Sequence, residues 1–177
     1  MIKLLKKIHL FGVWRKLCLF FVNNLFAGTS FFGIKRVLLR AIGYRIGLHT
    51  KIVAPFVCFG EVVIGNDCWI GRNFTVNGNG SVMIGNCCDI APDVSILTGG
   101  HQIGCAQRRA GKGEAYSINI GHGVWIGSRA TLLGNISIGD GAVVAACSCV
   151  NKNVEKNTLV AGVPAQKKRE LSCNGKD

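Results

Sequence analysis

The sequence predicts an all-β solenoid, a parallel β-helix, with a short helical extension at its N-terminus. Three observations predict it. Aliphatic residues recur every six positions between residues 46 and 150, glycine often follows them, and residues 1–43 show a helical period instead. The 24 glycines are about twice the roughly 7% found in average proteins, without a collagen-like triplet. The glycine content therefore indicates a repeating structure with many positions at which only glycine fits the backbone conformation.

The six-residue register is the main evidence for the solenoid. Each hexapeptide is long enough for a short strand and a corner, with its aliphatic side chain pointing inward, so three of them predict a coil of about 18 residues. A β-sandwich would space its turns irregularly. The register predicts a β-helix domain over residues 44–171 and a tail over 172–177. Fifteen positions carry the register: Ile46, Ile52, Cys58, Ile64, Ile70, Val76, Ile84, Ile90, Ile96, Ile120, Ile126, Leu132, Ile138, Val144 and Val150.

The N-terminal extension, residues 1–43, is basic as well as apolar. Residues 1–51 contain ten Lys or Arg and no acid, and Ser30 and Gly43 are expected to cap and end a second helix. Such a charge usually meets phospholipid headgroups, nucleic acid or a phosphorylated ligand. The remainder carries no nucleic-acid motif, so no nucleic-acid partner is expected. The apolar run at 17–22 is too short to span a bilayer, and we interpret it as neither a cleaved signal nor a spanning helix.

The cysteines predict neither a disulfide framework nor a metal site. Nine are present, without a C-x-x-C pair or a histidine-rich cluster. Cys58, Cys68, Cys88 and Cys147 fall at repeat positions where a small apolar residue serves, so we interpret them as reduced thiols of a cytoplasmic protein. No metal is expected.

His101 is the candidate for chemistry among four histidines. His9, His49 and His122 are read as solvated surface residues, whereas His101 follows two glycines and opens residues 102–117, where no hexapeptide occurs. A loop of that length in a compact solenoid is usually functional. A neutral imidazole can take the proton of a hydroxyl at physiological pH.

Three segments resemble the hexapeptide-repeat acyltransferases, over about residues 45–171. They are Ile90-Ala-Pro-Asp-Val-Ser-Ile-Leu-Thr-Gly-Gly-His101, Ile120-Gly-His-Gly-Val-Trp-Ile-Gly-Ser128, and Ala161-Gly-Val-Pro-Ala165 with the basic run that follows it. The branch that looks most similar is that of maltose, galactoside and polysaccharide O-acetyltransferases. The resemblance implies left-handed coils, a homotrimer, acetyl-coenzyme A as donor, and acetyl transfer to a sugar hydroxyl in surface polysaccharide biosynthesis.

The resemblance also implies roles for individual residues. His101 is the general base, and Asn77 and Asp93 are the acceptor-binding candidates. Each also has a plainer reading: asparagine is a favoured turn residue, and Asp93 could be an exposed turn acid. Gln166 departs from the family, whose members often place a basic residue there. The coenzyme-binding candidates are Trp125, Ser128, Ala146, Asn151, Lys152, Lys167, Lys168 and Arg169, of which the last three could instead form a solvated tail.

Alternatives stay open for the acceptor, the class of protein and the N-terminus. The acceptor could be serine, the amine of a nucleotide sugar, an antibiotic or another small sugar, and the rival class is a non-catalytic β-helix. Residues 1–26 have the composition of a helix lying on an anionic membrane, which would place the protein at the inner face of the cytoplasmic membrane and favour a lipid-linked glycan acceptor. The competing interpretation packs their aromatic side chains on the end of the β-helix. The five basic residues of that segment are Lys3, Lys6, Lys7, Arg15 and Lys16.

Overall fold

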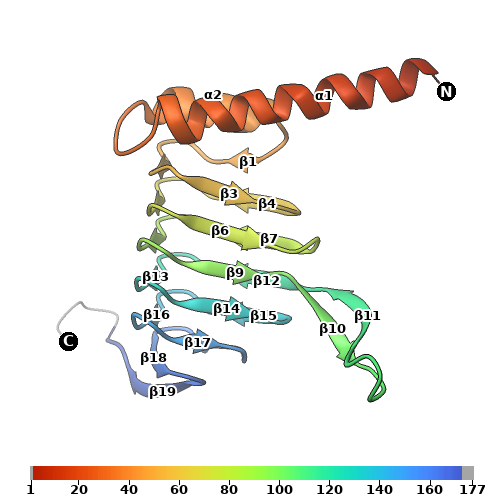
Figure 1. Ribbon diagram of the computed structural model, residues 1–177. Helices are drawn as coiled ribbons and strands as arrows, with labels where there is room; N and C mark the ends of the chain where they lie inside the picture. The colour runs from red at the N-terminus through yellow and green to blue at the C-terminus, as the bar shows by residue number, and fades with distance from the viewer. Residues whose placement is uncertain (1, 173–177) are drawn as a thin grey trace.

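The computed structural model describes residues 2–172, with side chains described from residue 10 onward; most of the predicted tail, residues 173–177, lies outside the described part. It is a three-sided parallel β-helix with a layer of helices at one end (Figure 1). In both figures the strands that face the viewer run from left to right while the coils descend from the helices, which is a left-handed path. The predicted fold class is confirmed.

Each side of the prism is one sheet. The first side holds β1 (Arg45–Ile46), β4 (Glu61–Ile64), β7 (Ser81–Ile84), β12 (Ser117–Ile120) and β15 (Ile136–Ile138). The second holds β2 (Lys51–Ile52), β5 (Trp69–Ile70), β8 (Asp89–Ile90), β13 (Trp125–Ile126), β16 (Val143–Val144) and β18 (Thr158–Gly162), with β19 (Ala165–Glu170) added antiparallel. The third holds β3 (Phe56–Cys58), β6 (Phe74–Asn77), β9 (Ser95–Leu97), β14 (Thr131–Leu133) and β17 (Cys149–Val150). A hairpin, β10 (Gly99–Ile103) and β11 (Ala110–Ala115), projects between the third and first sides (Figure 1).

The interior is built by the register that the sequence predicted. All fifteen register positions are buried, none more than 4% exposed, and equivalent residues pair in adjacent coils, as Ile46 with Ile64. The glycine after a register position is needed where coils stack closely, because a Cβ at Gly65 would lie 2.5 Å from the carbonyl oxygen of Gly85. Cys58, Cys68 and Cys88 are buried as expected. The expectation for Cys147 is wrong: it occupies a left-handed turn (φ 59°) that faces solvent, and Ser148 takes the interior position instead.

The helical layer closes the open end of the solenoid. It comprises α1 (Ile2–Phe20), the short π-helix η1 (Phe21–Leu25) and α2 (Phe32–Ala41). The Asn23 amide donates to the carbonyl oxygen of Phe56 (3.1 Å) and accepts from its N–H (2.9 Å), and Arg15 donates to the carbonyl oxygen of Cys58 (3.2 Å). These side chains give hydrogen-bond partners to backbone groups on the edge of the first coil, and the Tyr44 hydroxyl also donates to the carbonyl oxygen of Cys58.

One boundary of the helical layer differs from the sequence prediction. Ser30 does not cap α2, because Phe31 precedes the helix in a left-handed conformation (φ 55°) without a side-chain cap. Gly43, at φ 101°, follows the helix as predicted, and its N–H donates to the carbonyl oxygen of Arg40 (3.1 Å). None of the described helices combines the length and apolarity needed to cross a bilayer.

A buried lysine gives this layer a predicted pH dependence. Lys35 is fully buried, its ammonium donates to the carbonyl oxygen of Gly28 (2.7 Å), and burial lowers its pKa to about 8. Between that value and the unfolded pKa near 10.4, the unfolded chain binds more protons than the folded chain, so stability should rise with pH. We expect Lys35 itself to contribute a gain of about 1.5 kcal/mol from pH 8 to 9.5. It is measured by urea unfolding as the difference between the wild type and Lys35→Met, because the buried thiols, whose raised pKa values act in the opposite direction, are common to both proteins. The variant Lys35→Met should lack this gain, and an equal pH response in both proteins would contradict the assignment.

Candidate active site

Both interruptions of the six-residue register lie at one corner, between the third and first sides. The first is the two-residue insertion after β6, residues 77–80, and the second is the β10–β11 hairpin after β9 in the next coil. They touch: a Cβ at Gly78 would lie 2.5 Å from the Gly99 nitrogen, and one at Gly80 would lie 2.0 Å from the carbonyl oxygen of Tyr116. The residues that break the repeat therefore form one structure.

That corner holds an open hollow of about 610 Å³, which brings His101 and Asn77 together from adjacent coils. His101 is exposed on β10, where it pairs with Gly113 of β11, and Asn77 ends β6. An antiparallel hairpin takes the place of the loop expected at 102–117, and it projects from the prism (Figure 1). The hollow is lined by Asn77, Gly78, Asn79, Leu97, Gly99, Gly100, His101, Gly113, Glu114 and Ala115.

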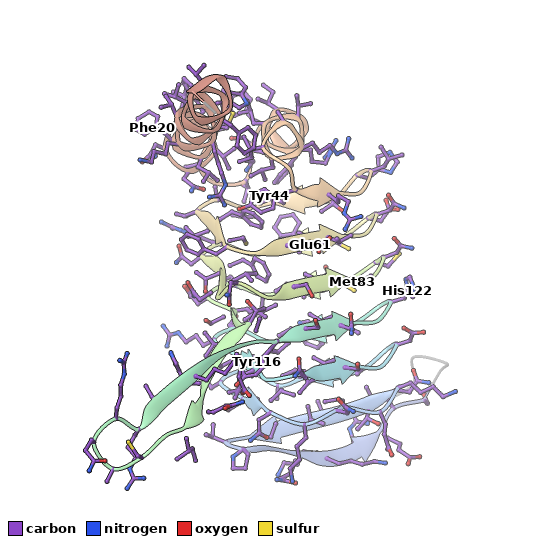
Figure 2. All side chains as sticks on the ribbon, turned by 90° about the vertical axis from the view of Figure 1, so that its right-hand side faces the viewer. Phe20, Tyr44, Glu61, Met83, Tyr116 and His122 are labelled. Atoms are coloured by element: carbon purple, nitrogen blue, oxygen red, sulfur yellow. The ribbon has the colours of Figure 1, made fainter. Side chains whose placement is uncertain are left out.

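Glu114 is a site residue that the sequence reasoning missed. One oxygen of its carboxylate accepts a hydrogen bond from the Gln102 amide (3.0 Å) and the other from the Tyr116 hydroxyl (3.1 Å). The hydrogen bond to Glu114 raises the pKa of Tyr116 above its usual value. The Tyr116 ring lies beside Gly100, where a Cβ would be 2.3 Å from the hydroxyl oxygen, at the base of the hairpin (Figure 2). Only the absence of hexapeptides over 102–117 pointed to these residues.

The other described histidines have structural partners away from the hollow. His49 pairs with Asp67 (3.2 Å) in an exposed turn. His122 accepts a hydrogen bond at Nδ1 from the Asn86 N–H (3.0 Å), at the corner between the first and second sides, across the molecule from the hairpin (Figure 2). His9 lies outside the residues whose side chains are described. Among the described residues, no group of three or more His, Cys, Asp or Glu is placed to hold a metal ion.

Asp93 does not line the hollow. It lies in the turn between β8 and β9, at the corner between the second and third sides, in a left-handed conformation (φ 63°). Its carboxylate accepts a hydrogen bond from the Asn73 amide (2.8 Å) in the preceding coil. β9, roughly 10 Å long for its three residues, separates this turn from the hairpin.

The coenzyme-binding candidates fall into two groups at different corners. Ser128 and Ala146 occupy equivalent turns of successive coils between the second and third sides, next to the exposed Trp125 on β13. Asn151 and Lys152 follow β17 at the corner between the third and first sides, below the hairpin. In one chain, the third side therefore lies between the two groups.

The C-terminal basic run is only partly available to a ligand. Lys152 and Lys167 line a smaller hollow of about 310 Å³. The Lys167 ammonium donates to Glu155 (2.9 Å) and Glu170 (3.0 Å), and these hydrogen bonds raise its pKa. Its charge is thus already balanced. Lys168 and Arg169 are exposed on β19, and Gln166, the departure from the family pattern, lines the same hollow.

Comparisons with known proteins find similar sequences among acetyltransferases. A family model described as bacterial transferase hexapeptide (six repeats) matches residues 117–152. The galactoside O-acetyltransferase of Escherichia coli is 36% identical over 118 residues, which cover 63% of this chain and 58% of that protein. Serine acetyltransferase 4 of Arabidopsis thaliana is 40% identical over 97 residues, covering 55% of this chain and 26% of that protein.

A solved structure extends the likeness to nearly the whole fold. The hexapeptide-repeat-containing acetyltransferase of Vibrio cholerae, complexed with acetyl-coenzyme A, superimposes with a TM-score of 0.80 at 26% identity, covering 94% of this chain and 90% of that one. The repeat and the fold are those of the hexapeptide-repeat transferases. The chain spans 55% to 63% of the length of the first three curated relatives that it matches.

Proposed function

We propose that this chain is an acetyl-coenzyme A-dependent O-acetyltransferase whose acceptor is a sugar hydroxyl, in the biosynthesis of a surface polysaccharide. The observation that carries the proposal is the hollow in which His101 and Asn77 lie together, on the scaffold of a family whose relatives include a galactoside O-acetyltransferase. A non-catalytic β-helix gives no reason for both breaks of the repeat to form one hollow around an exposed imidazole.

His101 acts as the general base in this mechanism. Its neutral imidazole accepts the proton of the acceptor hydroxyl while the oxygen attacks the thioester carbonyl carbon of acetyl-coenzyme A. The tetrahedral intermediate collapses by breaking its carbon–sulfur bond, and the imidazolium returns the proton to the departing thiolate. The products are the acetyl ester and free coenzyme A, so protons balance without a metal ion.

The polar lining suits an acceptor with several hydroxyl groups. The Asn77 amide can both donate and accept, and the Glu114 carboxylate can accept from a further hydroxyl. Glu114 is held from both sides by Gln102 and Tyr116, so it offers a fixed acceptor rather than a mobile one. Preorganised polar groups of this kind select a hydroxylated substrate over one that lacks them.

We also propose that the working enzyme is a homotrimer, because the donor candidates are divided between two corners. A neighbouring copy that presents its Ser128 and Ala146 turns to the hairpin corner of the first would bring both groups around one coenzyme. The same contact would bring Asp93, which shares the corner with Ser128, toward the hollow. The pantetheine arm fits beside small residues such as Ala146, and the phosphates fit Lys152, Lys168 and Arg169.

The donor assignment predicts a selective change in KM. Replacing both Lys168 and Arg169 with alanine should raise the KM for acetyl-coenzyme A about 10-fold and change kcat little, since charge-assisted hydrogen bonds to phosphate are lost. Lys167→Ala should have a smaller effect, because its ammonium is balanced by Glu155 and Glu170. Lys51→Ala, at the opposite end of the solenoid, controls for overall charge. An unchanged KM in the double variant would assign the run to the solvated surface.

The proposed function is tested by acceptor-dependent release of coenzyme A thiol. Galactosides, oligosaccharides, serine and aminoglycoside antibiotics are compared at equal concentrations, and mass spectrometry locates the acetyl group. We expect turnover with a sugar hydroxyl. Turnover with serine alone would favour the serine acetyltransferase alternative, which the likeness to the Arabidopsis protein supports. If none of these acceptors causes release of coenzyme A thiol, that result would count against the proposal.

A further inference from the structure

The helical layer carries most of the large apolar surface that the described residues leave exposed. Of nineteen exposed large hydrophobic side chains, eleven lie between residues 10 and 37. Such a concentration on one part of a protein usually marks an interaction surface, whereas single exposed apolar residues are ordinary. The eleven are Leu10, Phe11, Val13, Trp14, Leu17, Phe20, Phe21, Leu25, Phe31, Ile34 and Val37.

This apolar face is distinct from the face that packs on the β-helix. On α1 and η1, Cys18 and Val22 are buried, and Arg15 and Asn23 hydrogen-bond to the first coil. At 100° per residue, Val13, Leu17 and Phe20 fall on the opposite side of α1. They are 45%, 46% and 59% exposed, and Figure 2 shows Phe20 at the outer edge of the layer. Packing on the solenoid end therefore accounts for the inner face and leaves the outer face uncovered.

The charge of the layer identifies the kind of partner. The chain has no acidic residue before Glu61, and the layer is positive throughout. Several of its cations also anchor the first coil: Arg36 and Arg40 donate to the carbonyl oxygens of Thr50 and Ile46, as Arg15 does to that of Cys58. Arg15 thus faces inward, whereas Lys16, one residue later, is exposed. The other three basic residues of the first 26 lie outside the part of the chain whose side chains are described. Aromatic and aliphatic side chains with lysines and no acids are typical of an interfacial helix on anionic lipid.

We infer that the apolar face of the helical layer binds an anionic membrane surface, and that the acceptor is a glycan carried on a lipid in that membrane. The second half rests on the proposed function. Asn77 ends the second coil and His101 follows the third, so at about 4.8 Å per coil the hollow lies roughly 10–15 Å from the layer. The helices add roughly 10 Å, so a membrane on the outer face of the layer would lie roughly 20–25 Å from the hollow. That span suits a sugar several units along a glycan from its lipid anchor.

The first experiment measures binding of the full chain to vesicles by co-sedimentation. We expect pelleting with mixed phosphatidylglycerol and phosphatidylcholine vesicles, loss of pelleting at high salt, and none with phosphatidylcholine alone. Brominated lipid should quench tryptophan fluorescence, and the quenching should disappear in Trp14→Phe. The double variant Leu17→Gln and Phe20→Gln should bind roughly 100-fold more weakly, because two large apolar side chains leave the acyl boundary. The matched control, Val57→Gln and Met83→Gln, changes exposed apolar residues on the β-helix and should bind like the wild type.

The second experiment separates the membrane inference from the proposed function. The same glycan is offered on a lipid in anionic vesicles and free in solution, with the wild type and the Leu17, Phe20 double variant. We expect the wild type to prefer the lipid-linked form and the variant to lose that preference, while both turn over the free glycan equally.

Turnover without vesicle binding would overturn the membrane inference and leave the proposed function standing. Vesicle binding without acetyl transfer to any glycan would overturn the inference that the acceptor is a lipid-linked glycan. A doubling of mass in sedimentation velocity that the double variant abolishes would assign the face to a second copy.

Discussion

His101→Ala should lower kcat by roughly 10²–10⁴-fold while leaving the fold and the KM for acetyl-coenzyme A nearly unchanged. The imidazole lies exposed on β10 at the edge of the hollow and takes no part in the core. Its removal therefore deprives the acceptor hydroxyl of a proton acceptor without opening a cavity. The measurement is steady-state thiol release with a sugar acceptor, together with thermal unfolding of both proteins.

His49→Ala is the matched control for that variant. His49 is also exposed, its one ion pair with Asp67 is at the surface, and it lies at a different corner of the prism. It should keep wild-type turnover. Retained turnover in His101→Ala would show that another group accepts the proton, and Glu114, in the same hollow, would be the first candidate.

The solenoid was predictable because its interior repeats. A buried residue every sixth position, followed by glycine where coils stack closely, leaves a pattern that needs no knowledge of distant contacts, and all fifteen positions are buried. The burial of Cys147 was mispredicted because cysteine suits both an interior position and a turn. The prediction for Ser30 was wrong because serine is common at helix caps but is not confined to them. Phe31 precedes α2 in the structure instead.

The site was predictable only in part, because it is made where the repeat stops. His101 could be singled out from its place beside the interruption, yet the partners of Glu114 depend on how the hairpin pairs, with His101 opposite Gly113. Lys167 was read as a phosphate-binding charge, but its pairing with Glu155 and Glu170 depends on β19 folding back on β18. The two interruptions of the repeat lie at one corner because of the way the coils stack. The spacing of residues along the sequence does not reveal that they meet.

Gly80→Ala should lower kcat/KM for the acceptor by roughly 10²-fold by displacing the hairpin, although residue 80 does not line the hollow. A Cβ there would lie 2.0 Å from the carbonyl oxygen of Tyr116 and 2.7 Å from that of Thr98, the two residues that flank the hairpin. Ordinary contact needs more than 3 Å, so the backbone must shift by about 1 Å. The Tyr116 hydroxyl donates a hydrogen bond to Glu114 on β11, and β11 also pairs with His101 on β10. A shift of Tyr116 therefore reaches both sides of the hollow.

The measurement for Gly80→Ala is kcat/KM for the acceptor beside the KM for acetyl-coenzyme A, with urea unfolding to follow stability. Overpacking of this kind costs about 1–3 kcal/mol, so the β-helix should remain folded while the acceptor side of the reaction fails. Gly33→Ala is the matched control, because a Cβ on that exposed residue of α2 meets nothing within 4 Å. Wild-type kcat/KM in Gly80→Ala would mean that the hairpin tolerates the displacement, and that the contact between the two interruptions does not set the geometry around His101.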